Sequence, residues 1–480
     1  MKVLLLRPAA EKKSMARCMP LGLLAIASVL KRAGHEPRIL DLRISEDPDQ
    51  ELQNTLSSFK PDAVGIGVMT IESKYGFIDA AKVKQLAPGV PVILGGPHCK
   101  HEPQYILNHK QIDVMVVGEG DVTIVELINA MEAGHPLDTI AGIAFRRDDE
   151  YVTTEARPII RNLDDYEQEY DLIDMEAYFN FKCSMDFFPV YRSPRFIPLV
   201  TSRGCPFKCT YCHDIFAKSI QYRTAEVVVD EMEMLVNKYG IEEFHIVDDT
   251  FNLNMKRAKR IMDLILERGL KVHLSFPNGL RADFFDDELI EKMEKAGAYR
   301  LALGIESGSQ RIQDNIKKDL DISILPGVVK KLSKAHISVH GFFMLGFPTE
   351  TREEMEGTID FACKLGLTTA NFSLVIPNPG TELRDSFIEE MELAEDGFSD
   401  YSFDAAECNA SQVADEELIE LKREANRRFY FSGKRVRHVL EAIEPKWLVR
   451  SMFKTPFALL WRNAIAPTNA PTGHDSQIQH

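Results

Sequence analysis

The feature that most constrains the fold is the alternation of short apolar runs and amphipathic segments over residues 1–135. The runs have the length and composition of buried strands, whereas segments 21–32 and 75–86 have helical spacing. Buried strands that alternate with helices form a parallel sheet covered on both faces. We therefore predict an α/β domain with a Rossmann-like, doubly wound parallel sheet over residues 1–140. The runs read KVLLLRP, EPRILDL, DAVGIGVM, PVILGG and DVMVVGEG.

A second alternating series begins near residue 197. Its six apolar runs are separated by segments with helical spacing at 225–238, 255–268, 286–296, 324–334 and 353–365. Six strand–helix units fit an open, partial (β/α)6 barrel of TIM type better than a full eightfold one. The expected plan is a hairpin and linker over 141–192, the barrel over 193–395, a helical C-terminal region over 396–465 and a disordered tail over 466–480.

The composition excludes several protein classes. A net charge of −16 over 480 residues argues against a nucleic-acid binder. Eight cysteines are too few for a disulfide scaffold, so we expect a reducing, cytoplasmic setting. The N-terminus turns charged after a few apolar residues and is typical of a first strand, with no secretory signal. The longest apolar run, residues 20–30, is shorter than the ~20 residues of a membrane span.

Residues 422–462 form a basic and aromatic segment. It holds eleven Lys or Arg against three Glu, a net +8, together with Phe, Tyr and Trp. This composition suits a helix on an anionic membrane surface or a lid over an apolar substrate. The alternative is a helical cap whose aromatic side chains pack on the barrel. From this segment we predict a hydrophobic small-molecule substrate, of lipid or tetrapyrrole type, and a peripheral membrane contact as one option.

Three cysteines, Cys205, Cys209 and Cys212, stand in the stretch RGCPFKCTYCHD directly after the first predicted barrel strand. A structural zinc site takes four ligands, usually in two separated pairs, and the other five cysteines of the chain stand singly. Three thiolates instead suit a 4Fe–4S cluster that keeps one iron open. On spacing alone, a zinc knuckle or a redox pair is the alternative.

With Tyr211 between the last two cysteines, this stretch resembles the C-x3-C-x-aromatic-C signature of the radical S-adenosylmethionine (radical SAM) superfamily. The resemblance extends over residues 197–383, through DDTFN, PNGLRAD, GIESGS, GFFMLGFPTET and PNPGTEL after successive strands. It implies a partial (β/α)6 barrel and a cluster that reductively cleaves SAM to a 5′-deoxyadenosyl radical. A flavodoxin or ferredoxin is the expected electron donor.

The resemblance also implies a set of SAM-binding residues. Glu306, beside Ser307, stands at a strand end where a carboxylate could hold the SAM amino group or ribose. Arg281 could pair with the SAM carboxylate as a planar fork. The backbone of Leu345 and Gly346, with Tyr211, is expected near adenine. For Arg281 and Glu306 taken singly, a surface ion pair is the alternative.

The first domain resembles the cobalamin-binding domain of one large radical SAM subclass. The resemblance rests on GGPH after the fourth strand and VVGEGD after the fifth, and adjacent glycines let a bulky ligand approach the backbone. The implied cobalamin-binding residues are Gly95, Gly96, His98, Gly118, Glu119 and Gly120.

One motif of many cobalamin domains is missing. D-x-H-x-x-G, whose His ligates cobalt from below, occurs nowhere in the chain, and the loop after the first strand reads RPAAEKKS. We therefore predict base-off cobalamin without this ligand, with Met69 and Thr70 facing its lower side. His98 is expected to be a hydrogen-bonding loop residue rather than a cobalt ligand.

The combined resemblance predicts a cobalamin-dependent radical SAM enzyme that methylates an unactivated carbon. An oxygen-independent cyclase of bacteriochlorophyll synthesis has the same two-domain plan and stays open. A non-catalytic cobalamin sensor is an alternative of another class. A methylthiotransferase would need a second set of N-terminal cysteines, which Cys18 and Cys99 do not supply. Residues 181–191 and the C-terminal segment are expected to line the substrate site.

Overall fold

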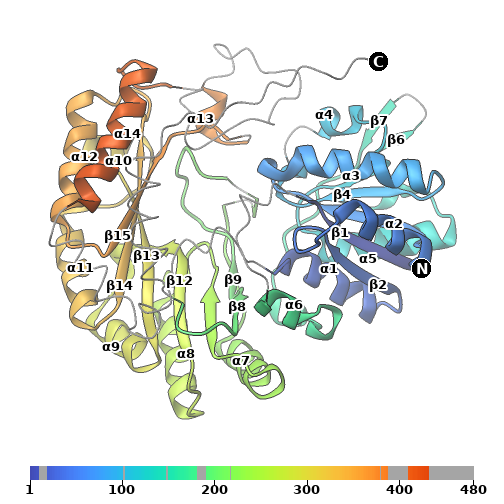
Figure 1. Cartoon of the computed structure of the whole chain (residues 1–480), viewed down its shortest axis with the longest axis horizontal. Helices are drawn as coiled ribbons and strands as arrows, with labels where there is room; N and C mark the ends of the chain where they lie inside the picture. Colours follow the sequence, from blue (N-terminus) through green and yellow to red (C-terminus); the bar gives the residue numbers. More distant parts are fainter. Residues whose placement is uncertain are drawn as a thin grey trace.

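The computed structural model contains two large, mainly parallel sheets, each covered by helices and lying side by side (Figure 1). It describes residues 1–9, 19–100, 103–147, 150–180, 191–213, 215–216, 218–378, 380–386 and 409–431. The predicted tail 466–480, the stretch 181–190 and the basic segment beyond Phe431 lie outside the described residues.

The first sheet has the strand order β2-β1-β3-β4-β5-β6-β7, and β1 to β5 are parallel. The order reverses between β1 and β3, and ligands of such sheets bind at the carboxyl ends of the strands near this point. The strands are β1 (Lys2–Arg7), β2 (Glu36–Asp41), β3 (Ala63–Gly67), β4 (Val92–Gly95) and β5 (Val114–Val116). The helices are α1 (Leu21–Arg32), α2 (Pro48–Phe59), α3 (Ser73–Leu86), α4 (Pro103–Asn108) and α5 (Gly120–Ala133).

The continuous apolar character of β1 follows from burial on both faces. Val3 and Leu5 pack in the cluster that holds the apolar side chains of α1 and α5. Leu4 and Leu6 pack in the opposite cluster, with side chains of α2, α3 and α4. This is the doubly wound arrangement predicted from the sequence, and the fold class is confirmed.

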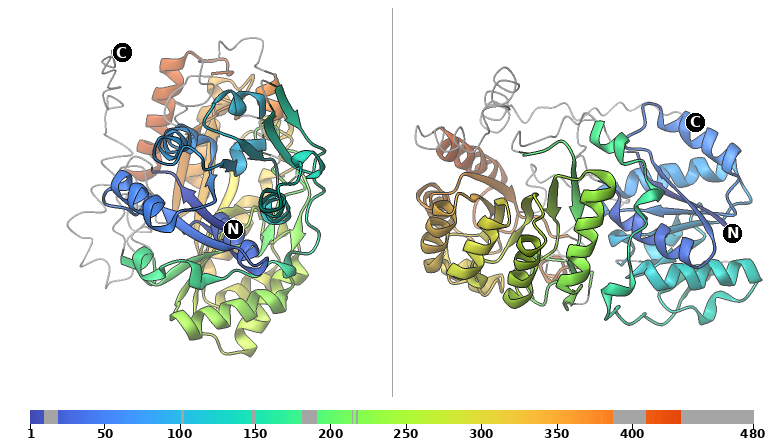
Figure 2. Two further views of the ribbon diagram at one scale, coloured as in Figure 1. Left: turned by 90° about the vertical axis from the view of Figure 1, so that its right-hand side faces the viewer. Right: turned by 90° about the horizontal axis from the view of Figure 1, so that it is seen from below.

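The predicted hairpin forms and continues the first sheet. Strands β6 (Ile143–Arg147) and β7 (Glu150–Thr153) pair antiparallel, and β6 pairs antiparallel with β5. After the hairpin, η5 (Leu163–Asp165), η6 (Tyr170–Leu172) and α6 (Met175–Asn180) lead to the second sheet, and Figure 2 shows this connection between the two sheets. Tyr178 donates a hydrogen bond to Asp41 of the first sheet at 2.9 Å, and Tyr170 donates one to Glu231 of the second domain at 2.6 Å.

The second sheet has six parallel strands in the order β15-β14-β13-β12-β11-β8, with its helices on the outer side (Figure 1). Its strands are β8 (Phe196–Leu199), β11 (Glu243–Ile246), β12 (His273–Leu280), β13 (Ala298–Glu306), β14 (Ser338–Leu345) and β15 (Thr369–Leu374). Its helices are α7 (Ala225–Tyr239), α8 (Met255–Glu267), α9 (Asp287–Lys295), α10 (Gln310–Asn315), α11 (Leu325–Lys334) and α12 (Arg352–Lys364).

Two small additions complete this half. The strands β9 (Ser202–Arg203) and β10 (Gln221–Tyr222) pair antiparallel and bracket the cysteine loop. Helices α13 (Glu382–Asp385) and α14 (Asp415–Tyr430) follow β15, and α14 packs on α12 and β15. The hydroxyl of Tyr430 donates to the Ala370 carbonyl at 2.6 Å and accepts from the Ala370 N–H at 3.1 Å. In the described part of the chain, no helix combines the length and apolar character needed to cross a bilayer.

Candidate functional site

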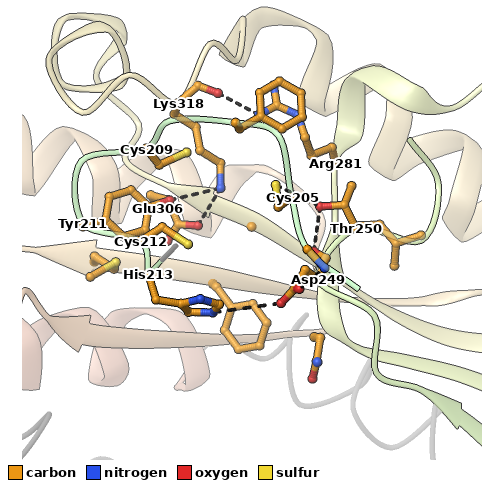
Figure 3. Close-up of a pocket in the computed structure, with 18 of the residues that line it drawn as sticks. Cys205, Cys209, Tyr211, Cys212, His213, Asp249, Thr250, Arg281, Glu306 and Lys318 are labelled. Carbon is orange, nitrogen blue, oxygen red and sulfur yellow. Dashed lines mark hydrogen bonds and ion pairs between the residues drawn. The ribbon is translucent and has the colours of Figure 1, made fainter. Parts of the chain in front are cut away.

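The three cysteines line one cavity of about 500 Å³ at the carboxyl ends of the second-sheet strands (Figure 3). The remaining wall comes from other residues of the cysteine loop and from residues in or after β11 to β15. The second group includes Asp249, Thr250, Arg281, Glu306, Lys318, Phe342, Met344 and Ser373. The structure thus brings together Cys205, Cys209, Cys212, Tyr211, Arg281 and Glu306 of the predicted site.

Two backbone N–H groups, one at the start of the cysteine loop and one within it, anchor the loop to the rest of the domain. Gly204 has φ +89°, and a side-chain Cβ there would lie 2.2 Å from the Ser219 carbonyl oxygen, so only glycine fits. Its N–H donates to Asp249 Oδ2 at 2.8 Å. Further along, the Thr210 N–H donates to the Ile316 carbonyl at 3.0 Å. These contacts fix the course of the loop backbone on either side of Cys205 and Cys209.

Burial raises the pKa of two of the three cysteines, Cys209 and Cys212. It raises the pKa of the Cys209 thiol, an effect that the Lys318 ammonium opposes, and it raises the pKa of Cys212 to about 11 against the opposing charge of Lys218. Within the described ranges, no three His, Cys, Asp or Glu side chains converge closely enough to hold a single metal ion. The predicted role of the three cysteines, in which each thiolate binds a different iron of a 4Fe–4S cluster, stays a prediction.

Lys318 is a site residue that the sequence reasoning missed. Its Nζ lies 2.9 Å from Glu306 Oε1 and 3.2 Å from the Tyr211 hydroxyl, as Figure 3 shows. Burial alone would lower the pKa of Lys318, but the charges of Glu306 and Cys209 outweigh it, and the pKa is raised. The adjacent Lys317 instead pairs with Glu382 at the surface. The two lysines are adjacent in the sequence, and only the folded structure shows that Lys318 lies in the cavity and Lys317 at the surface.

The backbone at Glu306 is in the left-handed region, with φ +68°, which is rare for a residue other than glycine. Glycine precedes it by two positions: a Cβ at Gly304 would lie 3.0 Å from both Glu306 Oε1 and Lys318 Nζ. The end of β13 is therefore adapted to hold this ion pair at the cavity wall. Strained residues of this kind cluster at functional sites.

Arg281 lies in the cavity wall with its guanidinium already engaged. Nε and one terminal nitrogen donate to the two Asp283 carboxylate oxygens at 3.0 and 2.8 Å. The terminal nitrogens also donate to the carbonyls of Lys318 and Asp319 at 2.8 and 2.7 Å. The guanidinium stacks 3.6 Å from the Phe207 ring centroid. Arg281 thus positions the backbone of Lys318, and its pairing with a SAM carboxylate stays a prediction.

Three predicted SAM-binding residues that the structure describes, Ser307, Leu345 and Gly346, do not line the cavity. Ser307 Oγ is 3.2 Å from Thr358 Oγ1, and Leu345 is fully buried. Gly346, with φ +98°, donates its N–H to Glu350 Oε2 at 2.8 Å. The expected contact of the Leu345 and Gly346 backbone with adenine stays a prediction, as does the part of Ser307 in binding SAM.

In the first domain, the predicted cobalamin loops lie next to each other at the carboxyl ends of the strands. Thr70 Oγ1 and His98 Nδ1 are 3.4 Å apart, and this contact joins the loops after β3 and β4. Met69 is 41% exposed, whereas His98 is buried. A Cβ at Gly118 would meet no atom within 4 Å, so the space beside this glycine is open. These features fit a cobalamin cradle.

Three other residues of the predicted cradle have roles inside the protein. A Cβ at Gly96 would lie 2.5 Å from the Val68 carbonyl oxygen, and one at Gly120 would lie 2.9 Å from Ile26. Glycine at these positions allows close packing. The Glu119 carboxylate accepts hydrogen bonds from the Ile160 N–H at 2.7 Å and from Arg203 at 3.2 Å. Contact of Gly96, Glu119 and Gly120 with cobalamin stays a prediction.

Two family models match the chain. The radical SAM superfamily model matches residues 199–362, and the B12 binding domain model matches residues 13–128. An uncharacterised methyltransferase of Pyrococcus horikoshii is 32% identical over 464 residues, 95% of each chain. Cytidylyl-2-hydroxyethylphosphonate methyltransferase of Streptomyces wedmorensis is 29% identical over 484 residues, 89% of this chain and 90% of that one.

The chain is also similar to the anaerobic magnesium-protoporphyrin IX monomethyl ester cyclase of Cereibacter sphaeroides. The two are 28% identical over 416 residues, 84% of this chain and 66% of the cyclase. Among solved structures, the radical SAM methyltransferase TsrM of Kitasatospora setae, with cobalamin and a 4Fe–4S cluster bound, has the same fold. Its TM-score is 0.71 at 18% identity, over 93% of this chain and 91% of TsrM.

These matches confirm the predicted superfamily and enzyme class, and they span both sheets. The chain belongs to the radical SAM superfamily and carries an N-terminal B12-binding domain, and it is similar to methyltransferases and to an anaerobic cyclase.

Proposed function

We propose that this enzyme transfers a methyl group from SAM to an unactivated carbon of a small, largely hydrophobic substrate. The observation that carries the proposal is the cavity in which the three cysteines face the Lys318–Glu306 pair. Cys205, Cys209 and Cys212 would hold the cluster, and Met69, Thr70, Gly95 and Gly118 would lie against a base-off cobalamin. Together these cofactors supply SAM cleavage and a carrier for the methyl group.

The protein's own part is to bind and orient SAM and the substrate. Lys318 is a buried cation suited to a carboxylate, and Glu306 is a buried carboxylate suited to an ammonium or a ribose hydroxyl. The amino acid end of SAM carries both a carboxylate and an ammonium group. On binding, the carboxylate would contact Lys318 and the ammonium would contact Glu306, and these two contacts would replace the ion pair between the two side chains. Phe342 and Met344 also line the cavity and give it a partly apolar wall, which supports a hydrophobic substrate.

The test is anaerobic reconstitution followed by incubation with SAM and a flavodoxin or ferredoxin reducing system, with products followed by mass spectrometry. Methyl transfer requires about four irons and one corrin per chain, with formation of S-adenosylhomocysteine and 5′-deoxyadenosine. Iron and 5′-deoxyadenosine without any bound corrin would contradict the proposal.

A radical cyclase is the second candidate, because the cyclase of Cereibacter sphaeroides aligns with 84% of the chain. The product decides between them. Methyl transfer adds one CH₂ to the mass of the substrate, whereas oxidative cyclisation removes hydrogen or adds oxygen. The proposed membrane contact depends on the part of the basic segment beyond Phe431 and is tested separately, by vesicle flotation of the full chain.

A further inference from the structure

Arg203 joins the two domains at the entrance to the cysteine loop. Its two terminal nitrogens donate to the two carboxylate oxygens of Asp121 at 2.9 and 3.0 Å. One of them also donates to Glu119 Oε1 at 3.2 Å. Asp121 and Glu119 belong to the VVGEGD stretch of the first domain, and Arg203 stands two residues before Cys205. One side chain thus links the two loops that the cofactors would occupy.

The link is well shielded from solvent. The Arg203 side chain is 18% exposed, and those of Asp121 and Glu119 are each 5% exposed. Burial alone would lower the pKa of Arg203, but the two carboxylates outweigh it and raise the pKa. Such a shielded, two-pronged contact is far more restrictive in geometry than a surface ion pair.

Both ends of the link are rigid. On the barrel side, Arg203 is in β9, paired with Gln221 of β10, and the next residue, Gly204, is anchored to Asp249. On the other side, Asp121 is in the first turn of α5, and Glu119 also accepts the Ile160 N–H at 2.7 Å. A shift of one domain against the other would therefore have to break the hydrogen bonds between Arg203 and Asp121, which we call the Arg203–Asp121 fork.

We propose that Arg203 is a positioning residue that fixes the cobalamin-binding loop Gly118–Asp121 relative to the cluster loop. The inference rests on the proposed function. In that function the methyl group would pass between cofactors held by the two domains, so the distance between the two loops would have to be fixed. Only the planar guanidinium grips both Asp121 oxygens at once. Lysine at this position would keep the charge and lose the fixed geometry.

The test compares Arg203→Lys and Asp121→Asn in the full-length, cofactor-loaded enzyme. Asp121→Asn does not change the sequence of the cluster loop. It provides the test if the Arg203→Lys variant does not fold. The matched control is Arg157→Lys: Arg157 also pairs with α5, through Thr123 and Glu126, but it does not reach the cluster loop. Iron content, bound corrin, backbone hydrogen exchange and S-adenosylhomocysteine release in a single turnover are measured for each.

We expect iron and corrin contents within about twofold of the parent enzyme and single-turnover release slowed by at least about tenfold in both fork variants. Backbone exchange at residues 118–121 and 203–205 should become faster in both, and all values should stay unchanged in the control. The inference would be overturned if S-adenosylhomocysteine release fell only in proportion to the cofactor lost. Unchanged backbone hydrogen exchange in the two variants would overturn it as well. If the parent enzyme releases no S-adenosylhomocysteine, the proposed function fails, while hydrogen exchange still tests the fork.

Discussion

The ammonium of Lys318 and the carboxylate of Glu306 form an ion pair 2.9 Å long inside the cavity that the three cysteines line. Both side chains are about nine-tenths buried, at 11% and 9% exposed. A buried pair of this kind contributes little net stability, because desolvation of the two charges offsets their attraction. Its presence at the cavity wall is better explained by ligand binding.

Replacing Lys318 with Met should leave the Glu306 carboxylate buried without its cation. Breaking a buried pair in this way costs about 3 kcal/mol of unfolding free energy, so the melting temperature should fall. The double variant Lys318→Met/Glu306→Gln removes both charges and should recover most of this stability. Both variants should lose SAM affinity by equilibrium dialysis. Full SAM affinity in the double variant would show that the pair has no part in binding.

Replacing Cys209 with Ala should remove one of the three thiolates and nearly abolish the iron–sulfur absorbance after reconstitution. The protein should still fold, because the loop is anchored through Gly204 and Thr210. Cys363→Ala is the control, since Cys363 lies on α12, away from the cavity. The 5′-deoxyadenosine yield should fall together with the iron content. Undiminished 5′-deoxyadenosine from Cys209→Ala would refute the cluster assignment.

The buried Glu350 should make stability depend on pH. Burial raises its pKa from 4.5 to about 7, although the N–H groups of Gly346 and Phe347 donate to its Oε2. A carboxyl with a raised folded pKa binds its proton more tightly in the folded state. Stability is therefore lost as the pH rises from 4.5 to 7, by about 3 kcal/mol in all, and stays lower above that window.

Glu350→Gln removes this titration and keeps an oxygen for both N–H groups. Chemical denaturation at pH 5 and pH 8 measures the difference for each protein. The parent should lose more stability than the variant between the two pH values, by up to about 3 kcal/mol. Equal losses in the two proteins would mean that Glu350 is ionised in the folded state across the range.

The adjacent glycines Gly95 and Gly96 should respond differently to substitution. Gly96→Ala places a Cβ 2.5 Å from the Val68 carbonyl oxygen at a φ of +105°, and it should destabilise the fold by about 2–3 kcal/mol. A Cβ at Gly95 has its nearest neighbour, a Val116 carbon, at 3.9 Å. Gly95→Val should therefore unfold like the parent but bind cobalamin at least about tenfold more weakly. Unchanged corrin retention in Gly95→Val would remove this glycine from the cradle.

Both sheets could be predicted because their central strands are buried on two faces and read as continuous apolar runs. In β1, Val3 and Leu5 are buried on one face of the sheet, and Leu4 and Leu6 are buried on the other. The β9–β10 pair was missed because two residues per strand leave no period to detect. The hairpin could be predicted from its own residues, but its pairing with β5 could not, since strand partners distant in sequence leave no local pattern.

The candidate site divides in the same way. The cysteines and Glu306 could be placed, because their motifs follow strand ends that parallel packing brings to one edge. The role of Lys318 could not, because its selection over Lys317 depends on the turn after α10. Nor could the occupied guanidinium of Arg281, whose partners Asp283, Lys318 and Asp319 meet it only in the folded chain.

The hydroxyl of Tyr430 occupies the place of a neighbouring strand at Ala370, since it both donates to and accepts from the backbone of β15. An unprotected outer strand is a template for pairing with another chain. Helix α14 covers β15 at this point and satisfies the Ala370 backbone groups, which disfavours pairing of another chain there. Phenylalanine at this position would keep the aromatic packing and expose both backbone groups, and with them a surface for aggregation.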